Sequence, residues 1–189
     1  MKRVLAVFLL LLVSGCGYNT LQSQDEQVKG AWSEVVNQYQ RRADLIPNLV
    51  ATVKGFASQE QQVLLGVTNA RAKVGSVQVT PETVNDPQAL RQFSQAQGEL
   101  TGALSRLLVV AENYPQLKSD KNFLELQAQL EGTENRITVE RMRFNEVVRD
   151  YNTKIKLMPG ALVAGMMGFK EKAFFEAAPG SETVPKVKF

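Results

Sequence analysis

Cys16 is the one cysteine in this chain of 189 residues, and its neighbours indicate the chemistry of its sulfur. Lys2 and Arg3 give a basic start, residues 4–13 form a short apolar run, and residues 14–15 are both small. This order is typical of a bacterial lipoprotein signal peptide, so it predicts cleavage before Cys16 and acylation of the sulfur. A diacylated or triacylated Cys16 would hold the mature chain stably on a membrane.

Two other interpretations of the first residues are an ordinary secretory signal and a membrane-spanning anchor. The apolar run of residues 4–13 is short of the ~20 residues that a helix needs to cross a bilayer. Gly17 follows Cys16 where a retention signal would place Asp. The sequence therefore predicts a lipid-anchored protein of the cell envelope, on the periplasmic face of the outer membrane if the cell is Gram-negative.

Histidine is absent from the chain, and no second cysteine is present. Metal sites made of Cys and His, nucleophiles paired with His, and imidazole acid–base catalysis are therefore excluded. Only carboxylates, lysines and tyrosines remain for catalysis. We accordingly predict that the protein is not an enzyme, with no catalytic residues, no metal and no cofactor.

Several charged or polar side chains stand at positions where helical periodicity predicts the core. They are Arg42, Glu60 and Glu140, and more mildly Gln97, Thr133 and Lys154. A buried charge must be paired or lose its charge, so we expect Arg42 to pair with Glu140. Other candidate partners are Glu134 and Glu131, on the same predicted helix. The predicted inter-helix polar network comprises Arg42, Glu131, Glu134, Arg136 and Glu140.

Buried polar groups of this kind often fix the register of packed helices. The alternative is a small-ligand or enzymatic site in the same cluster, with Asp44 and Asn135 as further members. Carboxylate metal sites of helical bundles use Glu-x-x-His motifs, which a chain without histidine cannot provide. The structural interpretation is therefore the stronger one.

The length of the chain predicts one domain, and its composition predicts that an apolar core stabilises this domain. Loss of Lys2 and Arg3 with the signal would leave one more basic than acidic side chain. No basic block with interleaved aromatic residues is present, so we predict no nucleic-acid partner. Because Cys16 has no partner in the chain, no internal disulfide can form.

Apolar residues recur at alternating spacings of three and four, which predicts long amphipathic helices. The first such pattern runs from Val28 to Val74, with Ser23 and Glu26 as a capping box and Gly75 as a left-handed C′ residue. Pro47 removes one helical hydrogen bond, so we expect a kink or break at residues 43–47 that gives two helical halves.

Residues 76–85 predict a linker, and Asp86 followed by Pro87 predicts the start of a second helix that closes before Pro115. Along this helix, Gly98, Gly102 and Ser105 lie on one side. These small residues either permit the backbone of a neighbouring helix to approach closely, or they are tolerated in the helix at a cost in stability. Ser119 is expected to cap a last long helix, which ends before Pro159.

These patterns predict an all-α protein: an elongated antiparallel bundle of long, coiled-coil-like helices, the first kinked near Pro47. The predicted divisions are a signal peptide (1–15), a lipidated tether (16–22), the bundle (23–178) and a flexible tail (179–189). Apolar residues from Leu162 to Phe175 are expected to cover the end of the bundle. The alternative for them is a patch that contacts the membrane or a partner.

Several short strings in combination resemble the LemA family of bacterial envelope proteins. They are YNTL (18–21), AWS (31–33), RRADLIPNLV (41–50), VKGF (53–56), AR (70–71), ENYP (112–115), LEGTENRI (130–137), RFN (143–145), YN (151–152), GF (168–169) and FF (174–175). The resemblance covers nearly all of the mature chain. It implies an elongated all-α bundle attached to a membrane through its N terminus. It implies no established activity and supplies no catalytic or ligand residues.

Many members of that family look as if they begin with a transmembrane helix, and this chain departs from them at Cys16. The function we expect is a non-enzymatic helical scaffold or adaptor that binds envelope proteins or the membrane. An envelope protein partner is thus predicted without an identity. A homo-oligomer formed through the flank with Gly98 and Gly102 is left open as a third interpretation.

Overall fold

The structure is a computed structural model that describes the backbone of residues 2–176 and the side chains of residues 17–176. Its elements are α1 (Lys2–Phe56), α2 (Gln61–Ser76), the 3-10 helix η1 (Pro81–Asn85), α3 (Pro87–Ala111), α4 (Pro115–Lys118), α5 (Lys121–Lys156) and α6 (Gly160–Met167). No strand occurs among residues 2–176. The predicted tail at 179–189 lies outside the described residues.

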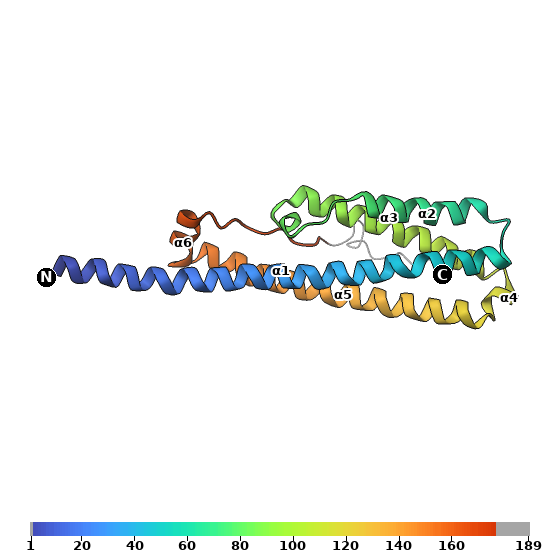
Figure 1. Cartoon of the computed structure of the whole chain (residues 1–189), viewed down its shortest axis with the longest axis horizontal. Helices are drawn as coiled ribbons and strands as arrows, with labels where there is room; N and C mark the ends of the chain where they lie inside the picture. The colour runs from blue at the N-terminus through green and yellow to red at the C-terminus, as the bar shows by residue number, and fades with distance from the viewer. Residues whose placement is uncertain (1, 177–189) are drawn as a thin grey trace, which may run out of the picture.

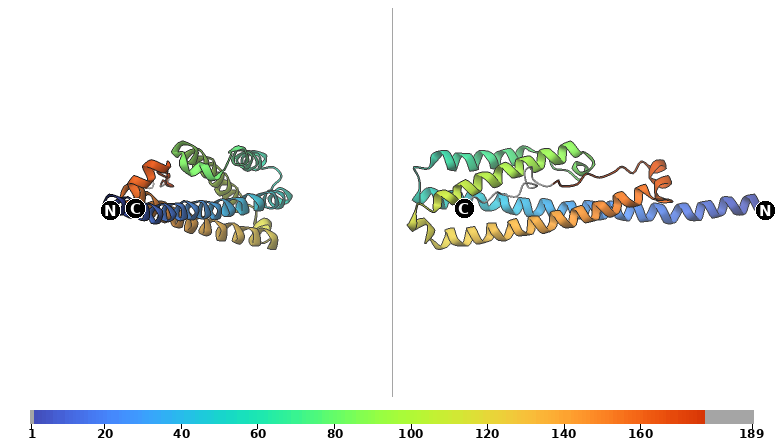
Figure 2. Two further views of the ribbon diagram at one scale, coloured as in Figure 1. Left: turned by 60° about the vertical axis from the view of Figure 1, so that its left-hand side comes forward. Right: turned by 180° about the vertical axis from the view of Figure 1, so that it is seen from behind.

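The helices form a long rod, as the sequence predicted (Figure 1). α1 and α5 run antiparallel along much of its length, and α2 and α3 form an antiparallel hairpin against them. The N-terminal part of α1 projects beyond the bundle at the end where α6 lies, as Figure 1 and the right-hand view of Figure 2 show. Within the described part of the chain, none of the helices has the combined length and hydropathy required of a bilayer span.

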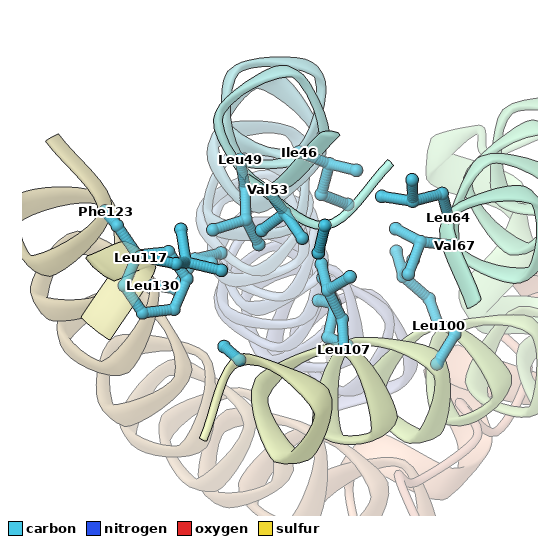
Figure 3. Close-up of a cluster of buried hydrophobic side chains, with 14 residues drawn as sticks. Ile46, Leu49, Val53, Leu64, Val67, Leu100, Leu107, Leu117, Phe123 and Leu130 are labelled. Carbon is cyan, nitrogen blue, oxygen red and sulfur yellow. The ribbon is translucent and has the colours of Figure 1, made fainter. Parts of the chain in front are cut away.

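One half of the core is aliphatic and lies toward α4. Figure 3 shows Ile46, Leu49 and Val53 of α1 facing side chains from the other helices. Those partners include Leu64 and Val67 of α2, Leu100 and Leu107 of α3, Leu117 of α4, and Phe123 and Leu130 of α5. Burying each such side chain contributes about 1.5–3 kcal/mol to stability. This packing therefore holds α1 to α5 together.

The other half of the core is aromatic and centres on Trp32. Its ring lies 5.4 Å from that of Phe93, 5.7 Å from Phe144 and 5.9 Å from Phe175. The indole nitrogen donates to the backbone oxygen of Thr80 at 3.1 Å. Residues from α1, α3, α5 and the C-terminal segment thus meet around one side chain, and the polar edge of that side chain is satisfied.

Pro47 does not interrupt the first helix, so the predicted break at residues 43–47 is wrong. α1 continues through Pro47 to Phe56, and the chain turns at residues 57–60 instead. Proline lacks the N–H that would bond the carbonyl of Ala43, but Arg71 of α2 donates its Nε to that oxygen at 3.0 Å. A neighbouring side chain therefore replaces the missing donor.

Three other predicted helix ends are displaced, and one is confirmed. α1 extends N-terminal of Ser23, so the predicted capping box lies inside a helix. Gly75 also lies inside a helix, because α2 continues to Ser76. Asp120, not Ser119, caps α5 by accepting from the backbone nitrogen of Phe123 at 2.9 Å. Asp86 caps α3 as predicted, ahead of Pro87 at the first helical position.

After α6, the chain turns at Gly168, whose φ of +77° is in the left-handed region. Residues 169–176, named here the strap, then run back along the bundle in an extended conformation (Figure 1). The side-chain amide of Asn152 bonds both the N–H and the carbonyl of Lys172, at 2.9 Å each. The amide of Asn145 does the same for Phe175, also at 2.9 Å. Two amides two helical turns apart thus fix the strap backbone to α5.

The contact between Arg71 and the Ala43 carbonyl gives a first prediction. Arg71→Ala should lower the free energy of unfolding by about 1 kcal/mol, because one hydrogen bond is lost. In a Pro47→Ala background the same change should cost much less, because the alanine backbone at that position supplies the helical donor. Urea unfolding followed by circular dichroism measures both changes. Equal costs in the two backgrounds would contradict the compensation.

Candidate functional site

Arg42 is the most deeply buried charged residue of the described chain, with 1% of its surface exposed. It occupies a core position of α1, one turn from Tyr39 on one side and one turn from Ile46 on the other. The aromatic half of the core includes Tyr39, and the aliphatic half includes Ile46. The guanidinium therefore lies at the boundary between the two halves.

The guanidinium of Arg42 bonds groups on two other helices. Its Nη1 donates to Glu134 Oε1 of α5 at 2.6 Å and to Thr101 Oγ1 of α3 at 2.9 Å. Its Nη2 donates to the backbone oxygen of Gln97 at 3.3 Å and to the side-chain oxygen of the same residue. The carbon of the guanidinium lies 5.1 Å from the centre of the Tyr39 ring.

The structure brings together only part of the predicted polar network. Arg42 pairs with Glu134, which was one of the expected partners, and leaves Glu131, Arg136 and Glu140 outside this contact. Glu131 is exposed and accepts from Gln127 at 3.0 Å. Glu140 lies 3.9 Å from Arg143, and Arg136 is exposed.

The other members of the rival cluster lie on the surface. Asp44 accepts from Gln40 at 2.8 Å, and Asn135 is exposed.

The remaining polar residues predicted in the core have different positions. Glu60 is half-buried and accepts from the Tyr114 hydroxyl at 3.0 Å. Lys154 is exposed, whereas Gln97 and Thr133 are buried as predicted.

A hollow of about 580 Å³ lies beside Arg42, between α3, α5 and the strap. Arg91 and Arg141 line it, together with Glu134 and Glu176. Arg91 lies 3.7 Å from the Glu176 carboxylate, and Arg141 donates to the Glu176 backbone oxygen at 3.2 Å. Of the described arginines that line this hollow, Arg42 and Arg91 are therefore paired with carboxylates, whereas Arg141 bonds a backbone oxygen.

The arrangement offers little for catalysis. Burial raises the pKa of the Tyr39 phenol despite the opposing charges of Arg141 and Arg42, so the phenol stays protonated at neutral pH. Both Nη atoms of Arg42 already have protein acceptors, while its buried Nε has no hydrogen-bond partner among the described residues. Within that same part of the chain, no three acidic or cysteine side chains converge as a metal site would require.

A second polar cluster, which the sequence analysis missed, lies near the α6 end. The side chains of Asp25 and Lys172 are 12% and 7% exposed, and Asp25 Oδ1 lies 2.6 Å from Lys172 Nζ. Lys172 also donates to Asn85 at 2.7 Å and lies 5.3 Å from the centre of the Tyr151 ring. Lys29 pairs with the other oxygen of Asp25 at 2.9 Å. A buried ion pair thus joins α1 to the strap.

The charges in this cluster shift the pKa of Asp25. Burial raises it, but the hydrogen bonds and charges of Lys172 and Lys29 outweigh burial and hold it below its ordinary value of 3.8. Hydrogen bonds to Glu26 and Asp25 raise the pKa of Lys29. Burial raises the pKa of Tyr151 to about 12. The carboxylate of Asp25 therefore stays ionised at neutral pH.

Part of this second cluster could have been found from the periodicity. Extending the core series of α1 backward from Val28, by three and then four residues, leads to Asp25 and then Leu21, and both are buried. The partner Lys172 lies in a non-helical segment without periodicity, so no pattern marks it as buried.

The flank with Gly98 and Gly102 is open in this chain. Together with Gly66 of α2, these residues line a groove of about 900 Å³ between α2 and α3. A side-chain carbon added at Gly98 would meet nothing within 4 Å. Of the two interpretations left open for these glycines, close approach of a neighbouring helix does not occur at Gly98 within the described chain.

The sequence matches the model of the LemA family over residues 31–189. Similar proteins include magnetosome proteins MamQ 1 and MamQ 2 of Paramagnetospirillum magneticum, each 27% identical over 198 residues, covering 95% of this chain and 72% of the relative. Protein LemA of Metamycoplasma hominis is 22% identical over 160 residues, covering 85% of this chain and 69% of the relative. The family match begins after Cys16, so the lipidation motif is a separate observation.

Removal of Glu134 should reveal the role of Arg42. Glu134→Ala leaves the buried guanidinium without its counter-ion, so the free energy of unfolding should fall by about 2–3 kcal/mol. Glu131→Ala is the matched control on the same helix, and it should change stability by less than about 0.5 kcal/mol. Urea denaturation of both variants makes the comparison. Similar losses in the two would contradict the assignment.

The Asp25–Lys172 pair should make stability depend on pH. Because the folded pKa of Asp25 is lowered, the pair contributes fully above the ordinary value of 3.8 and is lost as the pH falls through the folded value. Asp25→Asn should therefore cost about 3 kcal/mol near neutral pH and progressively less in acid. Urea midpoints measured across this range test it, with Glu26→Gln on the exposed neighbour as control. A cost that does not change with pH would refute the linkage.

Proposed function

Because the chain belongs to the LemA family, we propose that it is a lipoprotein of the cell envelope, anchored through Cys16. In this proposal it acts as a non-enzymatic scaffold or adaptor that binds envelope proteins or the membrane surface. In a Gram-negative cell, its place is the periplasmic face of the outer membrane. The identity of the family comes from the sequence match, and the anchor comes from residues 2–16.

The position of Cys16 in the rod is the observation that carries the proposal. Cys16 lies in α1, immediately before Gly17 and Tyr18, which lie close to α6 and the strap. A side-chain carbon added at Gly17 would lie 3.2 Å from Val163 of α6, and the ring of Tyr18 is 6.1 Å from that of Phe169. Cleavage before Cys16 would leave the packed domain intact and place the lipid at one end of it.

The shape of the domain suits a scaffold. α5 has 36 residues, so at 1.5 Å per residue its axis is about 54 Å long. A rod held at one end presents its long sides to other proteins. The buried polar groups are largely paired with one another, around Arg42 and around Lys172. These contacts favour a structural role for the clusters over a small-ligand site.

The anchor is tested by the mass and location of the native protein. Wild type should lack residues 1–15, carry two or three acyl chains, and sediment with membranes. Cys16→Ala should carry no acyl chains and should keep the signal. Ser14→Ala is the matched control, because it preserves a small residue beside the cleavage site and should behave as wild type. An unmodified Cys16 in wild type would overturn the anchor.

The adaptor role is tested by crosslinking in intact cells followed by mass spectrometry. Wild type should yield a crosslinked envelope protein that the Cys16→Ala variant loses, because only the anchored rod can reach it. An enzyme or small-ligand role would instead become the better account if wild type showed no protein partner. That role would also require that the Glu134→Ala variant keep its fold but no longer bind a small molecule that wild type binds.

A further inference from the structure

An exposed apolar surface lies at the α6 end of the rod. Residues 157–169 contain no charged side chain. Five large apolar side chains within this segment, named here the terminal patch, are exposed by more than half: Leu157 (61%), Met158 (74%), Leu162 (55%), Met166 (78%) and Met167 (57%). Other exposed large apolar residues are spread over α1, α2, α3, α5 and the strap. A concentrated apolar patch indicates a surface that is covered in use.

The underside of α6 is packed, so the helix is held in place while its outer face stays bare. Val163 and Ala164 pack against Leu21 of α1. The start of α6 lies close against the end of α5, because a side chain at Gly160 would collide with the carbonyl oxygen of Lys154. The exposure of the terminal patch therefore comes from a fixed arrangement of α6 on α1.

The patch lies beside the proposed lipid. A side-chain carbon added at Gly17 would lie 3.2 Å from Val163, and Cys16 directly precedes Gly17 in the same helix. Figures 1 and 2 show α6 next to the point where α1 leaves the bundle. Acyl chains attached at residue 16 would therefore enter a bilayer at the end of the rod that carries the terminal patch.

The charged residues around the patch suit an anionic lipid surface. Lys154 and Lys156 lie in the last turn of α5, and Lys170 follows α6; all three are exposed. Glu171 pairs with Lys156 at 2.6 Å and offsets its charge, so the attraction to anionic headgroups rests on Lys154 and Lys170. Lysines that flank an apolar interfacial segment are attracted to anionic headgroups, while Leu and Met side chains enter the boundary with the acyl chains.

We propose that the terminal patch lies in the membrane interface, so that the lipid on Cys16 and the outer face of α6 together hold the rod on the bilayer. This inference rests on the proposed function in taking Cys16 as the anchor. The occupant of the patch is the lipid surface itself. The contact restrains the orientation of the rod, which a flexible tether alone would leave free.

The test places one reactive thiol on α6 of the full-length lipoprotein. In the lipidated protein the sulfur of Cys16 is blocked, so Met166→Cys provides the only free thiol. Met142→Cys is the matched control, since Met142 is also exposed (61%) but lies in the middle of α5. Both variants are labelled with a polarity-sensitive fluorophore and reconstituted in vesicles of phosphatidylethanolamine and phosphatidylglycerol, with and without nitroxide-bearing lipid.

The fluorophore at position 166 should shift to shorter wavelength in vesicles and be quenched by the nitroxide lipid, while position 142 should show neither change. Equal responses at both positions would overturn the inference. A shift at 166 already present in detergent without vesicles, with a doubled mass in light scattering, would assign the patch to a second copy and also overturn it. Labelling of wild type at Cys16 would show instead that the proposed anchor fails.

Discussion

The guanidinium of Arg42 constrains how the helices fit together. It bonds Gln97 and Thr101 on α3 and Glu134 on α5, so a single side chain of α1 reaches two other helices. Helices packed only through rows of apolar side chains could slide past one another by a helical turn, because one Leu or Val can take the place of another in the contact. A buried charge has no equivalent position after such a slide, so it fixes the register at the boundary between the aliphatic and aromatic halves of the core.

Much of the helical architecture could be predicted from the sequence, because it depends on local patterns. Asp86 and Pro87 start α3 as expected, and the apolar spacings identify most of the core. The sequence could not exclude a break at Pro47, because the donor that compensates it, Arg71, is 28 residues away from the carbonyl it bonds. The pairing of Arg42 was predicted only as a set of alternatives, because Glu131 and Glu134 differ by less than one helical turn and the rotation of α5 decides between them.

The polar contacts of the C-terminal segment were beyond sequence reasoning for a related reason. Asparagine is commonly a surface residue, so the sequence does not mark Asn145 and Asn152. Only the course of the strap brings its backbone within hydrogen-bonding distance of their side chains. Lys172 is buried against Asp25 although nothing in its neighbourhood is periodic. Burial in a segment without regular structure is set by what the segment lies against, and that information is distributed over α1, η1 and α5.

The strap also has a consequence for the order in which the protein folds. Phe175 packs against Trp32 and Phe144, so residues at opposite ends of the described chain share one aromatic core. This half of the core cannot close until Phe175 is in place. The contacts that complete it span more than 140 residues of the sequence, from Trp32 to Phe175. The strap therefore closes the aromatic core, and a chain that ended before it would leave Trp32 and Phe144 without one of their aromatic partners.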